Sequence, residues 1–117
     1  MVGVDYISKE EFFKQPEDVQ RTFLEYFDHE EMLFLDGVIY FGIFKDEGKH
    51  TPLLTEGQLR RFIEDKTKGK IDITYDRVNG YGFLICRPDS FNSTYLKLGV
   101  DLLQAYWKVA TEVAKLV

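Results

Sequence analysis

Two tight-turn dipeptides, Asp36-Gly37 and Asn79-Gly80, restrict the fold of this chain more than any other feature of the sequence. Each dipeptide stands between two runs of apolar and β-branched residues. An Asx-Gly pair in that setting favours the two-residue turn of an antiparallel hairpin. The sequence therefore predicts two β-hairpins, within residues 31–44 and 70–87.

Two-residue turns also predict which residues face each other. In the first hairpin, Leu35 pairs with Val38 and Leu33 with Tyr40, and both faces are apolar. In the second hairpin, the predicted pairs are Tyr75 with Leu84, Ile73 with Cys86, and Asp72 with Arg87. This register places the second hairpin's apolar face, with Cys86, toward a core. It also predicts a cross-strand ion pair between Asp72 and Arg87.

Helix-start signals precede four amphipathic segments. They are Ser8 with Glu11, Pro16 with Glu17 and Asp18, Thr55 with Gln58, and Asp101. Ser, Thr and Asp cap helices, Glu or Gln three residues later completes a capping box, and Pro suits a first turn. Since 117 residues suffice for one core, we expect a single α+β domain over residues 1–117. It has about four antiparallel strands from two β-hairpins, with helices packed on one face.

The composition indicates in which cellular compartment this protein is expected. Cys86 is the one cysteine, so the chain cannot form an internal disulfide, and a reducing cytoplasm is the expected compartment. No apolar run approaches the length of a membrane span, and the N-terminus lacks the pattern of a signal peptide. We therefore expect no membrane association.

Adjacent arginines near the start of the third predicted helix raise the question of nucleic-acid binding. Arg60 and Arg61 each have an acidic residue four positions later, Glu64 and Asp65, which predicts intrahelical ion pairs. The whole chain carries a net charge of −5. A nucleic-acid-reading helix sits in a basic surrounding, so the sequence argues against direct nucleic-acid binding.

Motifs for catalysis or cofactor binding are missing from the sequence. It contains no glycine-rich phosphate loop, and His29 and His50 have no metal-ligand spacing. Ser90 has no nucleophile-elbow context. We therefore predict no catalytic, metal or cofactor residue, and no enzymatic activity.

The most suggestive surface is acidic and rimmed by aromatic residues. Its members are Glu25, Asp28, Glu30, Glu31 and Asp36, beside Phe34, Tyr40 and Phe44. These residues form either a solvated acidic loop or a patch that docks on a basic surface of a partner protein. In a docking patch, the charge would steer association and the aromatic residues would supply most of the affinity.

Two stretches show a resemblance to known proteins. "PLLTEGQLRRFIEDKT" (52–67) and "DLLQAYWKVATEVAKL" (101–116) resemble segments of small uncharacterised accessory proteins carried by phages and prophages of Gram-positive bacteria. The resemblance implies a setting in the host cytoplasm and transfers no site residues. With the acidic surface, it leads us to expect a protein that binds and inhibits a host factor. An anti-defence protein acting on a nucleic-acid-handling host protein is one example.

A second hypothesis stays open. The apolar first hairpin could wall a pocket or a dimer seam, which would suit a small-molecule or nucleotide-sequestering protein, or a small enzyme. The residues that could then meet a phosphate are Arg77, Arg87, Tyr95 and Lys97. Self-association into a homo-oligomer through the exposed apolar face is compatible with either hypothesis.

Overall fold

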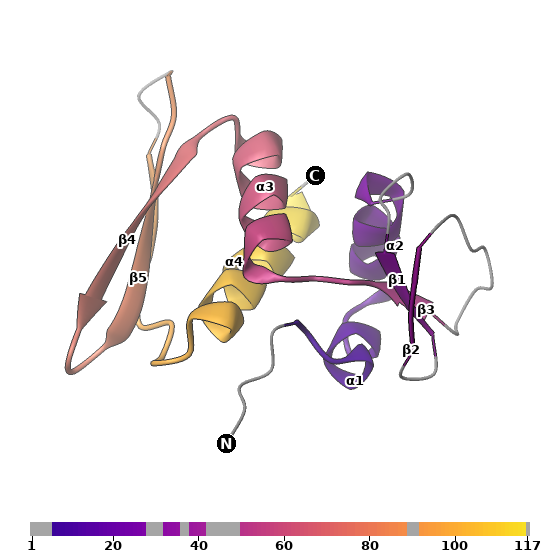
Figure 1. The fold of residues 1–117 in the computed structure, drawn as a ribbon. Coiled ribbons are helices and arrows are strands. Elements are labelled where there is room, and N and C mark those ends of the chain that lie inside the picture. Colours follow the sequence, from indigo (N-terminus) through magenta and orange to yellow (C-terminus); the bar gives the residue numbers. More distant parts are fainter. Residues whose placement is uncertain (1–5, 28–31, 36–37, 42–49, 89–91, 117) are drawn as a thin grey trace. The chain divides into compact units, whose positions relative to one another are not determined.

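The computed structural model describes residues 6–27, 32–35, 38–41, 50–88 and 92–116, with backbone only for residues 32–35, 38–41 and 50. The chain divides into two compact units, unit 1 (residues 1–54) and unit 2 (residues 55–117) (Figure 1). Each unit combines helices with an antiparallel sheet, so the α+β class is confirmed. Both predicted hairpins form, and each gains a short third strand. The described strands therefore make two three-stranded sheets in place of one four-stranded sheet.

Unit 1 holds two helices and the first sheet. The elements are α1 (Lys9–Phe13), α2 (Glu17–Tyr26), β1 (Met32–Leu35), β2 (Val38–Phe41) and β3 (His50–Pro52). The strand order is β2-β1-β3, and both pairings are antiparallel. Leu33 pairs with Tyr40 and Leu35 with Val38, which confirms the predicted register of this hairpin.

Helix starts in unit 1 follow the predicted signals. The Ser8 hydroxyl accepts a hydrogen bond from the backbone N–H of Glu11 at 3.2 Å and caps α1. Pro16 lies directly before α2. The buried apolar side chains include Ile7, Phe12, Val19, Phe23, Phe27, Leu53 and Leu54. Within this set, the ring centroids of Phe12 and Phe23 are 6.3 Å apart, so α1 and α2 pack against each other.

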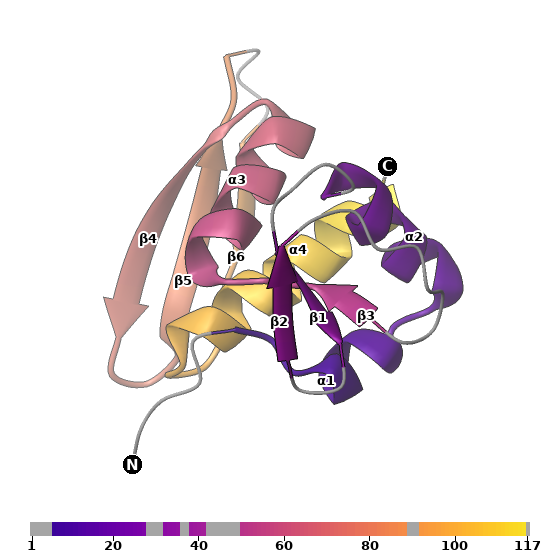
Figure 2. The same cartoon turned by 45° about the vertical axis from the view of Figure 1, so that its right-hand side comes forward.

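Unit 2 holds two longer helices and the second sheet. The elements are α3 (Glu56–Thr67), β4 (Lys70–Asp76), β5 (Gly80–Cys86), β6 (Ser93–Tyr95) and α4 (Leu102–Leu116). The strand order is β4-β5-β6, and both pairings are antiparallel. Figures 1 and 2 show α3 and α4 on the same side of this sheet. The rings of Phe83 on β5 and Tyr106 on α4 meet there, with centroids 4.8 Å apart.

Caps of the two long helices match the sequence. Thr55 and Gln58 form the complete capping box, with both hydrogen bonds at 3.3 Å. The Asp101 carboxylate accepts from the N–H of Gln104 at 3.1 Å, which caps α4. The apolar side of α4 is buried at Leu103, Tyr106, Val109, Ala110, Val113 and Ala114.

The predicted register of the second hairpin is wrong by three residues. The pairs are Tyr75 with Tyr81, Ile73 with Phe83, Asp72 with Leu84, and Asp76 with Gly80. The turn is therefore a three-residue loop, in which the Asp76 carboxylate accepts from the N–H groups of Val78 (2.6 Å) and Asn79 (3.2 Å). Gly80 follows with φ 75°, the left-handed conformation that closes such a loop.

An odd shift of register moves residues to the other face of the sheet. Phe83 and Ile85, instead of Leu84 and Cys86, share the buried face with Ile71. Cys86 is half-buried and pairs with Lys70, so its predicted inward position is wrong. The predicted ion pair of Asp72 with Arg87 is wrong as well, because Leu84 stands opposite Asp72.

Candidate functional site

The acidic, aromatic-rimmed surface predicted from the sequence lies mostly outside the described residues. Asp28, Glu30, Glu31, Asp36 and Phe44 fall outside the described ranges. The backbones of Phe34 and Tyr40 occupy neighbouring register positions of the β1–β2 hairpin. Glu25 is exposed on α2.

Helix α2 presents a charged outer face in unit 1. Glu17, Asp18 and Glu25 are exposed there, together with Arg21 and the apolar side chain of Leu24. Val19 and Phe23 lie on the opposite, buried side of the same helix. Residues three, four and seven apart share a helix face, so the exposed carboxylates face one direction.

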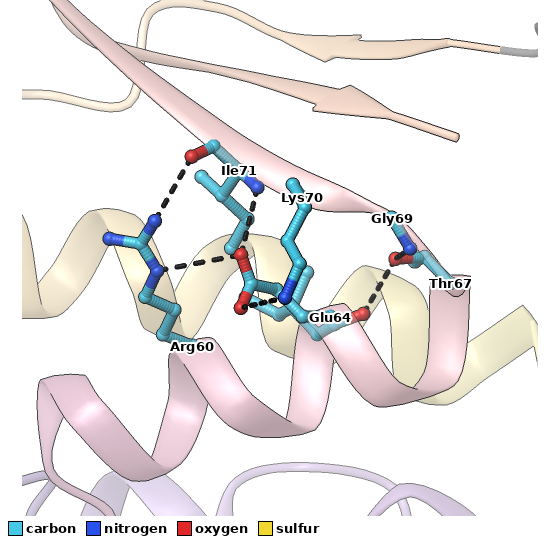
Figure 3. A network of polar contacts seen from close by, with 7 residues as sticks. Arg60, Glu64, Thr67, Gly69, Lys70 and Ile71 are labelled. Atoms are coloured by element: carbon cyan, nitrogen blue, oxygen red, sulfur yellow. Dashed lines mark hydrogen bonds and ion pairs between the residues drawn. The ribbon is translucent and has the colours of Figure 1, made fainter. Parts of the chain in front are cut away.

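In unit 2, side chains of α3 hold the backbone of β4 (Figure 3). The Ile71 N–H donates to Oε2 of Glu64 at 3.0 Å, and the Ile71 carbonyl accepts from Nη2 of Arg60 at 3.1 Å. The predicted ion pair of Arg60 with Glu64 is confirmed, with Nε and Oε2 3.5 Å apart. Lys70 adds a longer ion pair to Glu64, at 4.0 Å. Arg60 therefore has a structural role, since it satisfies a strand carbonyl.

This arrangement determines which backbone groups of β4 remain at its open edge. Both polar groups of Ile71 point away from β5, and alternate residues of a strand point the same way. Ile73 and Tyr75 therefore direct their N–H and C=O groups toward the same side. Strand β5 gives independent evidence, because Tyr81, the partner of Tyr75, directs its own groups away from β4. The Tyr81 N–H donates to the Gly99 carbonyl at 2.7 Å, and its carbonyl accepts from Leu98 at 3.0 Å.

We call the outward groups of Ile73 and Tyr75, with the side chains around them, the β4 edge. Within the described ranges, no strand pairs with β4 on that side. Tyr75 is 55% exposed, and its ring contacts the Tyr81 ring with centroids 4.9 Å apart. Asp72 projects from the other face of the strand and is exposed.

Two ionisable groups in unit 2 have shifted pKa values. Hydrogen bonds from Val78 and Asn79 lower the pKa of Asp76 below its ordinary value of 3.8. Burial raises the pKa of Tyr106 above 10.0, and the nearby Arg60 guanidinium partly opposes that effect. Both shifts follow from the local structure around each group.

The structure keeps the two arginines of the phosphate-binding hypothesis apart. Arg77 lies in the turn before β5 and Arg87 directly after its last residue, so a whole strand of roughly 24 Å separates their positions. Tyr95 is on β6, and Lys97 follows it with φ 58°.

Neither a metal-ligand cluster nor a membrane-spanning helix occurs in the described parts of the chain. No group of three or more His, Cys, Asp or Glu residues there could hold a metal ion. None of the described helices is long and apolar enough to cross a bilayer. The backbone of His50 lies in β3, whereas His29 and Ser90 fall outside the described ranges.

The sequence predicts the Arg60–Glu64 ion pair but not the hydrogen bonds of this pair to the backbone of Ile71. Glu64 and Ile71 are seven residues apart, on different elements, so no helical periodicity joins them.

Comparison with known proteins finds no matching protein-family model, no similar curated protein and no similar solved structure.

Proposed function

We propose that this chain is a non-enzymatic phage or prophage accessory protein that binds and inhibits a host protein. The binding surface is the acidic, aromatic-rimmed one that includes Glu25, Glu30 and Glu31. The supporting observation is the unequal charge of the two units. Residues 1–54 carry 12 acidic and 5 basic residues, a net −7, whereas residues 55–117 carry 8 acidic and 10 basic residues, a net +2.

A locally concentrated negative charge favours a partner with a basic surface. The exposed carboxylates of Glu17, Asp18 and Glu25 extend this charge along α2. Long-range attraction raises the association rate, and neighbouring aromatic side chains supply the short-range affinity. For those anchors the proposal relies on Phe34, Tyr40 and Phe44.

Capture from a lysate of a Gram-positive host tests this function. The tagged full-length protein is compared with the triple variant Glu25→Lys, Glu30→Lys, Glu31→Lys. A single host protein retained by the wild type should be retained roughly ten-fold less by the variant, because attraction becomes repulsion. Glu112→Lys is the control, since Glu112 is exposed on α4 of unit 2. It should capture normally.

Two results would reject the proposal. Equal capture by the triple variant would rule out the acidic surface. A captured protein whose own activity is unchanged by saturating amounts of this chain would rule out inhibition.

A further inference from the structure

We propose a second interaction surface: the β4 edge of unit 2 accepts an extended basic peptide segment of a partner protein as an additional antiparallel strand. This surface belongs to a different unit from the acidic one and does not depend on it. Addition of a strand to an open edge is a common mode of peptide recognition, in which backbone hydrogen bonds supply affinity and alternate side chains supply specificity.

The edge is protected at one end only. Natural sheets shield their edges with short strands, prolines, bulges or lysines. β4 is seven residues long, contains no proline, and carries its one lysine at the first position. The Arg60–Glu64 pair occupies the N–H and C=O groups of Ile71. No described residue occupies the outward groups of Ile73 and Tyr75, which leaves up to four backbone hydrogen bonds for a partner.

Side chains beside the edge specify the chemistry of that partner. On one face, the exposed Tyr75 ring and the half-buried Ile73 offer apolar contact. On the other face stand Asp72, Thr74 and Asp76, all exposed. No hydrogen bond or ion pair of the Asp72 side chain occurs in the described structure, so its carboxylate is available. Directly opposed residues of opposite charge stabilise antiparallel strands.

A second copy of this chain does not satisfy that chemistry. An isologous antiparallel pairing that uses both free residues places Ile73 opposite Tyr75 of the other copy. The same register places Asp72 of each copy opposite Asp76 of the other, so two such acidic pairs form. Like charges directly opposite one another are destabilising. The edge therefore suits a foreign strand with basic residues opposite Asp72 and Asp76 and apolar residues opposite Ile73 and Tyr75.

The predicted recognition pattern is basic–apolar–any–apolar–basic. A suitable probe is the acetylated and amidated peptide Thr-Lys-Val-Thr-Val-Lys-Thr. It is titrated into the ¹⁵N-labelled full-length protein, and backbone amide shifts are followed by NMR. We expect saturable shifts centred on Ile73 and Tyr75. Replacing both lysines of the peptide with glutamate should weaken binding roughly ten-fold, and the variant Asp72→Lys should remove that preference, because the introduced lysine then favours glutamate while Asp76 still favours lysine.

N-methylation separates strand addition from simple charge attraction. In the predicted pairing, both valine N–H groups point at β4, whereas the N–H of the central threonine points away. Methylating both valine nitrogens should abolish binding, and methylating the threonine nitrogen should preserve it. Equal binding of the two methylated peptides would overturn the proposal. So would the absence of amide shifts at millimolar peptide, or a peptide-free dimer that protects the Ile73 and Tyr75 amides from exchange.

Discussion

The carboxylate of Glu64 accepts a hydrogen bond from the backbone N–H of Ile71 at 3.0 Å, and thereby links α3 to the beginning of β4. Arg60 completes the contact from the same helix by donating to the Ile71 carbonyl. Together the two side chains act as a substitute for one residue of a neighbouring strand. The remainder of the edge, at Ile73 and Tyr75, has no such cover within the described ranges.

Glu64→Ala should destabilise the protein. The variant removes a largely buried carboxylate, the cap of the Ile71 N–H and the partner of Arg60. We expect the free energy of unfolding to fall by about 1–2 kcal/mol, measured by urea denaturation. Glu112→Ala is the matched control, because the Glu112–Lys115 pair is exposed and should contribute less than about 0.5 kcal/mol. Equal losses in the two variants would contradict a structural role for the Glu64 contact.

Phe83→Ala should remove a principal contact between β5 and α4. Phe83 is fully buried, and its ring meets that of Tyr106. Loss of a buried aromatic side chain costs about 3–5 kcal/mol through lost transfer energy and the cavity that remains. Thermal and urea unfolding measure this loss. Val78→Ala, at an 89% exposed turn position, should leave stability within about 0.5 kcal/mol.

Substitutions at two glycines should have opposite effects on the stability of the fold. Gly80 has φ 75°, and a Cβ there would overlap the backbone carbonyl of Gly99. Gly80→Ala should therefore cost about 2 kcal/mol or more. Gly57, in the first turn of α3, has open space around its Cα, so Gly57→Ala should stabilise the protein by about 0.5 kcal/mol. Circular dichroism during urea unfolding distinguishes the two outcomes, and a destabilised Gly57→Ala would contradict the described surroundings of that helix start.

The Asp76 turn should weaken in acid. Its folded-state pKa is lowered, so its stabilising contribution is present above the unfolded-state pKa and is lost as the pH falls through the lower folded value. NMR titration of the Asp76 carboxyl should give a midpoint below 3.8. In Asp76→Ala, the amide hydrogens of β4 and β5 should exchange faster. A midpoint at or above 3.8 would show that the Val78 and Asn79 hydrogen bonds do not form in solution.

Local features of the fold could be predicted from the sequence, whereas pairings across the chain could not. Capping at Ser8, Thr55 and Asp101 depends on residues three positions apart, and all three caps are present. The second hairpin was predicted out of register because Asn79-Gly80 matches a two-residue turn. The Asp76 side chain instead stabilises a three-residue loop. The dipeptide alone does not show that this loop is favoured over the two-residue turn.

In the candidate sites, too, local contacts could be predicted from the sequence and contacts between elements could not. The ion pair of Arg60 with Glu64 follows from helical spacing, but its hold on Ile71 requires the chain to turn back after α3. Lys68 makes that turn possible by adopting a left-handed conformation, φ 59°, at the end of α3. The outward groups of Ile73 become recognisable only once the direction of the Ile71 groups is known.

The most direct test of a host-binding function is the salt dependence of capture. The tagged full-length protein is incubated with host lysate at about 50 and about 300 mM salt, and retained proteins are quantified by mass spectrometry. Screening lengths fall well below 10 Å at the higher salt, so a protein held by the acidic surface should be retained strongly at low salt and much less at high salt. No retained protein, or one retained equally at both concentrations, would contradict the acidic-surface function.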